Sequence, residues 1–143
     1  MSDVIFVDTN ILIYAHDIDA PLKRDSAIER LRFLWETGFG RVSVQVLQEF
    51  YVNATRKLAK PIARSIAREV VSSYSAWVRD VTSPDTVLRA TDIAEMAQIS
   101  FWDGLIVASA EQVGASQIYS EDLNSGQSIA GILIVNPLIP RSS

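Results

Sequence analysis

Cysteine is absent from this chain of 143 residues, and histidine occurs only once, as His16. Without cysteine the chain has no disulfides and no thiolate metal ligands, and a zinc site is not expected with one histidine. The absence of disulfides is typical of a cytoplasmic protein. Asp8 and Asn10 interrupt the first apolar run, and no basic segment precedes it, so we expect no signal peptide. The longest uncharged stretch, residues 123–140, is too rich in polar residues, glycine and proline to span a membrane.

Basic residues are scarce in the last third of the chain. Arg141 is the only one beyond residue 90, and the formal net charge is −4, which is not typical of a general nucleic-acid binder. The segment from 50 to 68 is different, because it contains basic residues and no acid. It is either a solvated helix face or a patch that contacts phosphates. Its basic residues are Arg56, Lys57, Lys60, Arg64 and Arg68.

Hydrophobic residues make up 48% of the chain, which is enough for a sizeable core, and the length fits one domain. We therefore expect residues 1–143 to form a single domain. Short apolar runs predict strands, and apolar residues at helical spacing predict helices. Strands are expected at 4–7, 41–44, 117–120 and 132–135, and helices at 21–38, 46–57, 61–77, 85–98 and 102–113.

Alternation of strands and helices predicts a parallel sheet covered on both faces, in a three-layer α/β/α domain. We expect Trp35, Trp77 and Trp102 in its core. In such a sheet, ligands bind beyond the carboxyl ends of the strands, where helix N-termini also point. Four acids occupy such places, and we expect them to converge at one edge. Asp8 follows the first strand, Glu49 lies in the helix after the second, Asp103 opens an apolar helix and Asp122 follows the third strand.

Converging carboxylates repel one another unless protons or cations separate them. Oxygen ligands of this kind suit Mg²⁺ or Mn²⁺, and the chemistry typical of such a site is hydrolysis of a phosphodiester by a metal-bound water. Each acid also has a simpler interpretation, Asp103 as a helix N-cap and Asp8 as a turn residue. Spacing alone does not decide between these interpretations.

Four motifs, taken in order, resemble the PIN-domain family and most closely its toxin-like bacterial ribonucleases of VapC type. They are VDTNILIYA (7–15), SVQVLQEF (43–50), SFWDGLIVASA (100–110) and IYSEDL (118–123). The resemblance implies a PIN-like fold with a central parallel sheet of four to five strands. The catalytic, metal-binding acids that it implies are Asp8, Glu49, Asp103 and Asp122, supported by the polar residues Asn10, Ser43 and Ser120. Glu121 is an ambiguity beside Asp122, and motif position favours Asp122.

The resemblance further implies a Mg²⁺- or Mn²⁺-dependent endoribonuclease that cleaves single-stranded regions of RNA. It implies a homodimer and a small antitoxin that plugs the site. On this reading Asp8 and Asp103 ligate the metal directly, and Glu49 ligates it or orients the attacking water. Asp122 binds a second metal or acts through water. His16 is expected to be structural, because metal-assisted hydrolysis does not need it.

Two other functions remain in competition. A phosphotransfer domain, either a receiver or a haloacid-dehalogenase-like phosphatase, is disfavoured because Thr9 and Asn10 stand where those proteins place a second acid. They also place a catalytic lysine late in the chain, and no lysine follows Lys60. A non-catalytic PIN-like module that binds RNA or protein is the alternative, although a pure binder has no reason to keep four clustered acids. Within the family, a housekeeping RNA-processing role remains open beside that of a toxin.

Overall fold

The computed structural model describes residues 2–138, so Arg141 lies outside the described residues. Within them the chain forms five strands, six α-helices and one 3-10 helix. The strands are β1 (Ile5–Val7), β2 (Gly40–Arg41), β3 (Gln117–Tyr119), β4 (Ser128–Ile129) and β5 (Ile132–Val135). The helices are α1 (Thr9–Tyr14), α2 (Pro21–Thr37), α3 (Val44–Arg56), α4 (Arg64–Tyr74), η1 (Ser75–Trp77), α5 (Pro84–Ala97) and α6 (Phe101–Gln112).

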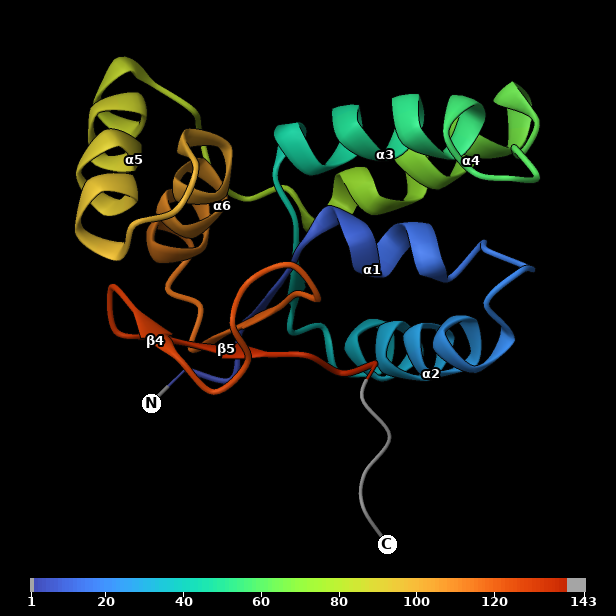
Figure 1. Cartoon of the computed structure of the whole chain (residues 1–143), viewed down its shortest axis with the longest axis horizontal. Coiled ribbons are helices and arrows are strands. Elements are labelled where there is room, and N and C mark those ends of the chain that lie inside the picture. Colours follow the sequence, from blue (N-terminus) through green and yellow to red (C-terminus); the bar gives the residue numbers. More distant parts are fainter. Residues whose placement is uncertain (1, 139–143) are drawn as a thin grey trace, which may run out of the picture.

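The strands form one sheet in the order β2-β1-β3-β5-β4, and helices flank it (Figure 1). The first four strands in that order pair in parallel, as the sequence predicts. The edge strand β4 is the exception, because it pairs antiparallel with β5. Ala130 and Gly131 join these two strands with positive φ angles of 51° and 79°, the backbone that a two-residue hairpin turn needs. The predicted α/β class is confirmed, with a mostly parallel sheet.

The register of β1 against β3 positions the later part of the chain beside the N-terminal motif. Val7 pairs with Tyr119, so Asp8 and Ser120 leave the sheet side by side. Phe6 and Ile118 are fully buried, as expected of parallel strands covered on both faces. The fold therefore brings two segments more than 100 residues apart in sequence to the same edge.

Helices pack in pairs around this sheet (Figure 1). α5 and α6 form one pair, and α3 and α4 form the other, with α1 packed against α3. Gly104 permits the close approach of α6 to α5, since an added Cβ would lie 2.6 Å from the carbonyl oxygen of Ala90. No helix within residues 2–138 is long and apolar enough to cross a membrane.

Several boundaries differ from the sequence prediction. The strand expected at 41–44 is only Gly40–Arg41, because Ser43 caps α3 and its Oγ accepts a hydrogen bond from the Val46 amide at 3.4 Å. The helix expected from Pro61 begins at Arg64. α1 was not predicted, because six residues are too few to establish a helical period.

The prediction that all three tryptophans are core residues is wrong for two of them. Trp77 is 4% exposed, whereas Trp35 is 42% and Trp102 is 62% exposed. Tyr51 and Ile66, which helical spacing would turn inward, are 37% and 48% exposed. Periodicity identifies an apolar stripe, but it does not say whether another element covers the whole width of that stripe.

Candidate functional site

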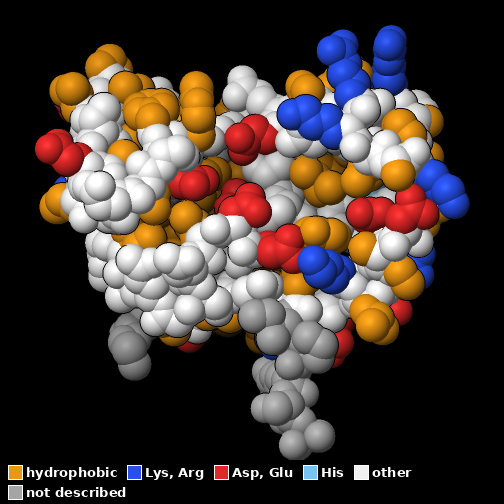
Figure 2. Space-filling view, viewed as in Figure 1, with side chains coloured by type: hydrophobic (Ala, Val, Ile, Leu, Met, Phe, Trp, Pro, Cys, Tyr) orange, Lys and Arg blue, Asp and Glu red, His pale blue; other side chains and the backbone are white. Residues whose placement is uncertain are grey.

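A small cavity of about 130 Å³ lies at the carboxyl edge of the sheet, and all four acids singled out in the sequence line it. They come from four separate segments: the end of β1, α3, the first turn of α6 and the loop after β3. Figure 2 shows acidic side chains gathered in the middle of this face. We call the cavity the acidic pocket. Its lining residues are Asp8, Thr9, Asn10, Ile13, Gln45, Glu49, Asn53, Asp103, Ile106 and Asp122.

Asp8 is the most buried of the four acids, with 5% of its surface exposed. It caps α1, and its Oδ1 accepts from the Thr9 amide at 2.7 Å. Its Oδ2 accepts from Ser120 Oγ at 2.8 Å. Burial raises the pKa of Asp8 to about 7, and the charges of Asp103 and Asp122 add to this, while the hydrogen bonds from Ser120 and Thr9 act in the opposite direction. A bound cation would relieve this destabilisation of the carboxylate.

Glu49 is held by a residue that the sequence analysis did not single out. The Thr9 hydroxyl donates to Glu49 Oε1 at 2.7 Å and so fixes the carboxylate of α3 to the start of α1. Thr9 stands between Asp8 and Asn10 in the DTN motif, so a signal for it was present in the sequence. Gln45 and Asn53 flank Glu49 at intervals of four residues, which places all three on one face of α3.

Asp103 lies in the first turn of α6 and is not its N-cap. Ser100 is the cap, and its Oγ accepts from the Asp103 amide at 3.1 Å. The interpretation of Asp103 as an ordinary N-cap is therefore wrong, and its carboxylate lines the acidic pocket. Burial raises the pKa of Asp103, and the charge of Asp122 adds to the effect.

Asn10 connects the two acids that follow neighbouring strands. Its Nδ2 lies 3.4 Å from Asp8 Oδ2 and 3.1 Å from Asp122 Oδ2, and it donates to both. Its Oδ1 accepts from the Glu121 amide at 3.0 Å, which fixes the loop that carries Asp122. Asn10 and Ser120 thus contact the acids they were expected to support. Ser43 does not, because it is the buried cap of α3.

Glu121 is turned away from the acidic pocket and is not among its lining residues. The Tyr14 hydroxyl donates to Glu121 Oε1 at 2.9 Å, and Lys23 Nζ lies 2.7 Å from Oε2. Both carboxylate oxygens are therefore engaged by α1 and α2. Asp122, rather than Glu121, faces the other acids. His16 also lies outside the pocket, where its ring packs 5.6 Å from that of Phe50 and burial lowers its pKa.

The donor set of the acidic pocket suits a hard cation. Carboxylate and amide oxygens are the ligands that Mg²⁺ and Mn²⁺ prefer, and the pocket holds no cysteine or histidine. Among residues 2–138, no three Asp, Glu or His side chains stand close enough together to enclose a metal ion. The residues fit the ion in kind, and ligation by three or more of them requires their carboxylates to move closer together.

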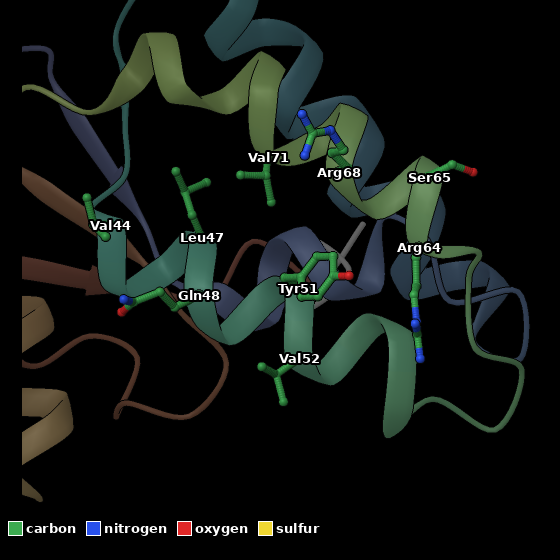
Figure 3. Close-up of a pocket in the computed structure, with 9 residues that line it drawn as sticks. All are labelled: Val44, Leu47, Gln48, Tyr51, Val52, Arg64, Ser65, Arg68 and Val71. Carbon is green, nitrogen blue, oxygen red and sulfur yellow. The ribbon is translucent and has the colours of Figure 1, made fainter.

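A second and larger hollow lies on another face of α3, between α3 and α4 (Figure 3). We call it the α3–α4 groove. Its volume is about 650 Å³, and apolar side chains dominate it, with two arginines of α4 at its edge. Its lining residues are Val44, Leu47, Gln48, Tyr51, Val52, Arg64, Ser65, Arg68 and Val71. Arg64 and Arg68 belong to the basic segment recognised in the sequence.

A comparison with known protein families identifies the family to which this chain belongs. The model of the PIN domain matches residues 5–126, a range that includes all four acids of the pocket. This chain belongs to the PIN-domain family. PIN domains are generally nucleases, so membership supports a hydrolase activity for the chain. No curated protein matches it in sequence.

Solved structures resemble this PIN domain over nearly its whole length. A chain of a toxin–antitoxin complex from Klebsiella pneumoniae aligns with a TM-score of 0.64 at 20% identity, covering 94% of this chain and 98% of that chain. A chain of VapBC2 from Rickettsia felis, bound to a DNA fragment from their promoter, aligns with a TM-score of 0.58 at 14% identity, covering 92% and 96%. At these identities the likeness shows a common fold.

Proposed function

We propose that this PIN domain is a metal-dependent endoribonuclease that cleaves single-stranded regions of RNA, and that it is the toxin of a toxin–antitoxin pair. The observation that carries the proposal is the convergence of Asp8, Glu49, Asp103 and Asp122 on one pocket. Within residues 2–138, none of these four acids forms a salt bridge, although other acids of the chain do. Four carboxylates without a cationic partner repel one another in one small pocket, which favours a role in binding a cation.

The residues of the pocket divide the work of such a reaction. Mg²⁺ or Mn²⁺, when bound, supplies a water of lowered pKa and stabilises negative charge on the phosphate. Asp8 and Asp103 hold the cation, Glu49 holds it or orients the attacking water, and Asp122 acts at a second cation or through water. Ser120, Asn10 and Thr9 fix the orientation of these carboxylates by hydrogen bonds.

The substrate and partners are proposed from exposed side chains and from the structural relatives. The basic residues of the 56–68 segment offer contacts to RNA phosphates. A protein antitoxin is proposed because both structural relatives belong to toxin–antitoxin complexes. A homodimer is proposed because Val44, Val81 and Trp102 are large apolar residues that are more than half exposed. The mass in solution of wild type and Trp102→Ser tests the dimer, which should dissociate in the variant.

Cleavage of labelled single-stranded RNA by purified protein tests the central proposal. We expect cutting with Mn²⁺ or Mg²⁺, none with chelator, and none by Asp103→Asn. Asp92→Asn is the matched control, because Asp92 is an exposed acid of α5, and it should cut as the wild type does. Equal cutting by both Asp variants would contradict the proposal. RNA binding without cutting by the wild type would favour the non-catalytic binding module.

Expression in a bacterial host tests the biological role. Induction of the wild type should arrest growth, and Asp103→Asn should not. Co-expression of a short reading frame adjacent to the gene should relieve the arrest. Normal growth on expression of an active wild-type nuclease would contradict a toxin and favour RNA processing.

A further inference from the structure

Gln45 lies on α3, one turn before Glu49, and lines the acidic pocket. Its Nε2 donates a hydrogen bond to the backbone carbonyl of Trp102 at 3.1 Å. A carbonyl oxygen only accepts hydrogen bonds, so the nitrogen end of the amide must face Trp102. This contact fixes the orientation of the amide and places Gln45 beside Asp103, the next residue of α6.

The other end of the amide has no protein partner. Gln45 Oε1 is buried and accepts no hydrogen bond within the described part of the chain. A buried oxygen without a partner is costly, and such atoms in native proteins commonly serve a water, an ion or a reaction. Two other side-chain atoms share this condition, on Asp80 and Ser109, and of the three residues only Gln45 lines the acidic pocket, although Asp80 lines the neighbouring hollow with it.

We propose that Gln45 is a further member of the cation-binding set of the acidic pocket, and that its Oε1 contacts the cation or a water that the cation carries. The proposal rests on the proposed metal-dependent function. An amide oxygen is a ligand of the type that Mg²⁺ and Mn²⁺ accept. Because it is neutral, it adds an oxygen to a pocket of four carboxylates without adding to their mutual repulsion.

The geometry assigns different tasks to the two ends of this side chain. The Nε2 end connects α3, which carries Glu49, to the start of α6, which carries Asp103. The Oε1 end is left without a protein partner, on a side chain that lines the acidic pocket and also a neighbouring hollow beside Trp102. A purely structural glutamine needs only the first of these, so an experiment must separate the binding of cation from the stability of the fold.

Calorimetric titration of the purified, cation-free protein with MnCl₂ provides that separation. Gln45→Met keeps the length of the side chain and removes the oxygen, and we expect it to raise the Kd for Mn²⁺ about tenfold. Gln45→Glu loses the same Nε2 donor but retains an oxygen, so its Kd should be well below that of Gln45→Met. Gln48→Met is the matched control, since Gln48 lies on α3 but faces the α3–α4 groove (Figure 3), and its Kd should be unchanged.

Thermal unfolding with and without MnCl₂ supplies the second readout. A ligand that binds only the folded state raises Tm by an amount that depends on its Kd. Gln45→Met should therefore show a smaller Mn²⁺-induced rise in Tm than the wild type, whatever its Tm in chelator. A lower Tm in chelator with an undiminished Mn²⁺-induced rise would show that Gln45 is only structural.

Three further outcomes overturn the proposal, and they differ in what they say of the proposed function. If Asp103→Asn abolishes Mn²⁺ binding while Gln45→Met binds as the wild type does, only the role of Gln45 is wrong. If Gln45→Met does not fold, a Kd of Gln45→Glu raised about tenfold or more above that of the wild type overturns it, because this variant retains the oxygen. If the wild type itself binds no Mn²⁺, both the role of Gln45 and the metal-dependent function are wrong.

Discussion

Helix α3 borders two hollows of very different character. On one face, Gln45, Glu49 and Asn53 contribute to the acidic pocket of about 130 Å³. On another face, Leu47 and Tyr51 contribute to the α3–α4 groove of about 650 Å³, which contains no acid. The smaller hollow contains the groups whose pKa values burial and mutual repulsion displace. Perturbed carboxylates, and not the volume of a cavity, are the feature that supports the acidic pocket as the proposed site of chemistry.

The strongest test of this contrast compares two substitutions by their effect on RNA cleavage. One removes an acid from the pocket, and the other removes an apolar residue from the groove. We expect Asp8→Asn to lower the rate of RNA cleavage by at least about a hundredfold, because loss of a cation ligand removes several kcal/mol of transition-state stabilisation. Val52→Ser in the groove should leave the rate within about twofold. Rates measured at saturating Mn²⁺ decide the matter, and a larger loss in Val52→Ser would reverse the comparison.

The raised pKa of Asp8 makes the empty pocket a source of instability at neutral pH. The folded state holds a proton on Asp8 up to about pH 7, whereas the unfolded chain releases it near 3.8, the ordinary pKa of an aspartate. The stability due to Asp8 is therefore lost as pH rises between these values. We expect the stability of Asp8→Asn relative to the wild type to increase by about 3 kcal/mol from pH 5 to pH 8 in chelator. Urea unfolding at the two pH values measures this, and a difference that does not change with pH would contradict the burial of this charge.

Gly104 follows Asp103 in α6 and lies where this helix packs against α5. A Cβ at this position would lie 2.6 Å from the Ala90 carbonyl oxygen, so Gly104→Ala must force α6 away from α5. We expect a loss of about 1–3 kcal/mol in the free energy of unfolding, despite the better helix propensity of alanine. Denaturant unfolding tests this expectation. A more stable variant would show that α5 and α6 are not packed closely here.

Substitution of the two arginines that line the α3–α4 groove should weaken RNA binding without changing the affinity for Mn²⁺. We expect Arg64→Ala combined with Arg68→Ala to weaken RNA binding several-fold and to lower the magnitude of the slope of log K against log salt by about 1.4, or about 0.7 for each charge removed. The Kd for Mn²⁺ should not change. Arg89→Ala is the control for charge, because Arg89 pairs with Glu111 on the other helix pair. An equal loss of RNA affinity in Arg89→Ala would indicate that net charge, and not these two positions, determines binding.

The smallest effect is expected outside the acidic pocket, at the contacts of Glu121 with α1 and α2. Tyr14→Phe removes one of the two side chains that hold Glu121, and an exposed ion pair with Lys23 remains. Such surface contacts contribute below about 1 kcal/mol. We expect stability to fall by less than that amount and cleavage to change by less than about threefold. A tenfold change in cleavage, absent when Glu121→Gln is added, would show that Glu121 reaches the reaction.

The sequence by itself determined the α/β class, most of the strands and helices, and the four acids. These features depend on local patterns: short apolar runs form buried parallel strands, and an acid directly after such a run lies at the carboxyl edge of the sheet. The boundaries were less predictable, because a cap such as Ser43 ends one element and begins another through a single hydrogen bond. The antiparallel β4 escaped prediction because two residues show no alternation.

Only the tertiary structure decided how the acids are arranged and which neighbours hold them. Asp8 meets Ser120, and Glu49 meets Thr9, across 112 and 40 residues of chain. Glu121 and Asp122 are adjacent acids in sequence, yet contacts from α1 and α2 turn the first away from the pocket. The unpartnered oxygen of Gln45 has no sequence signal, since it results from the packing of α3 against α6. Residue type and spacing specify which groups can react, while the environment of each group depends on segments that only folding brings together.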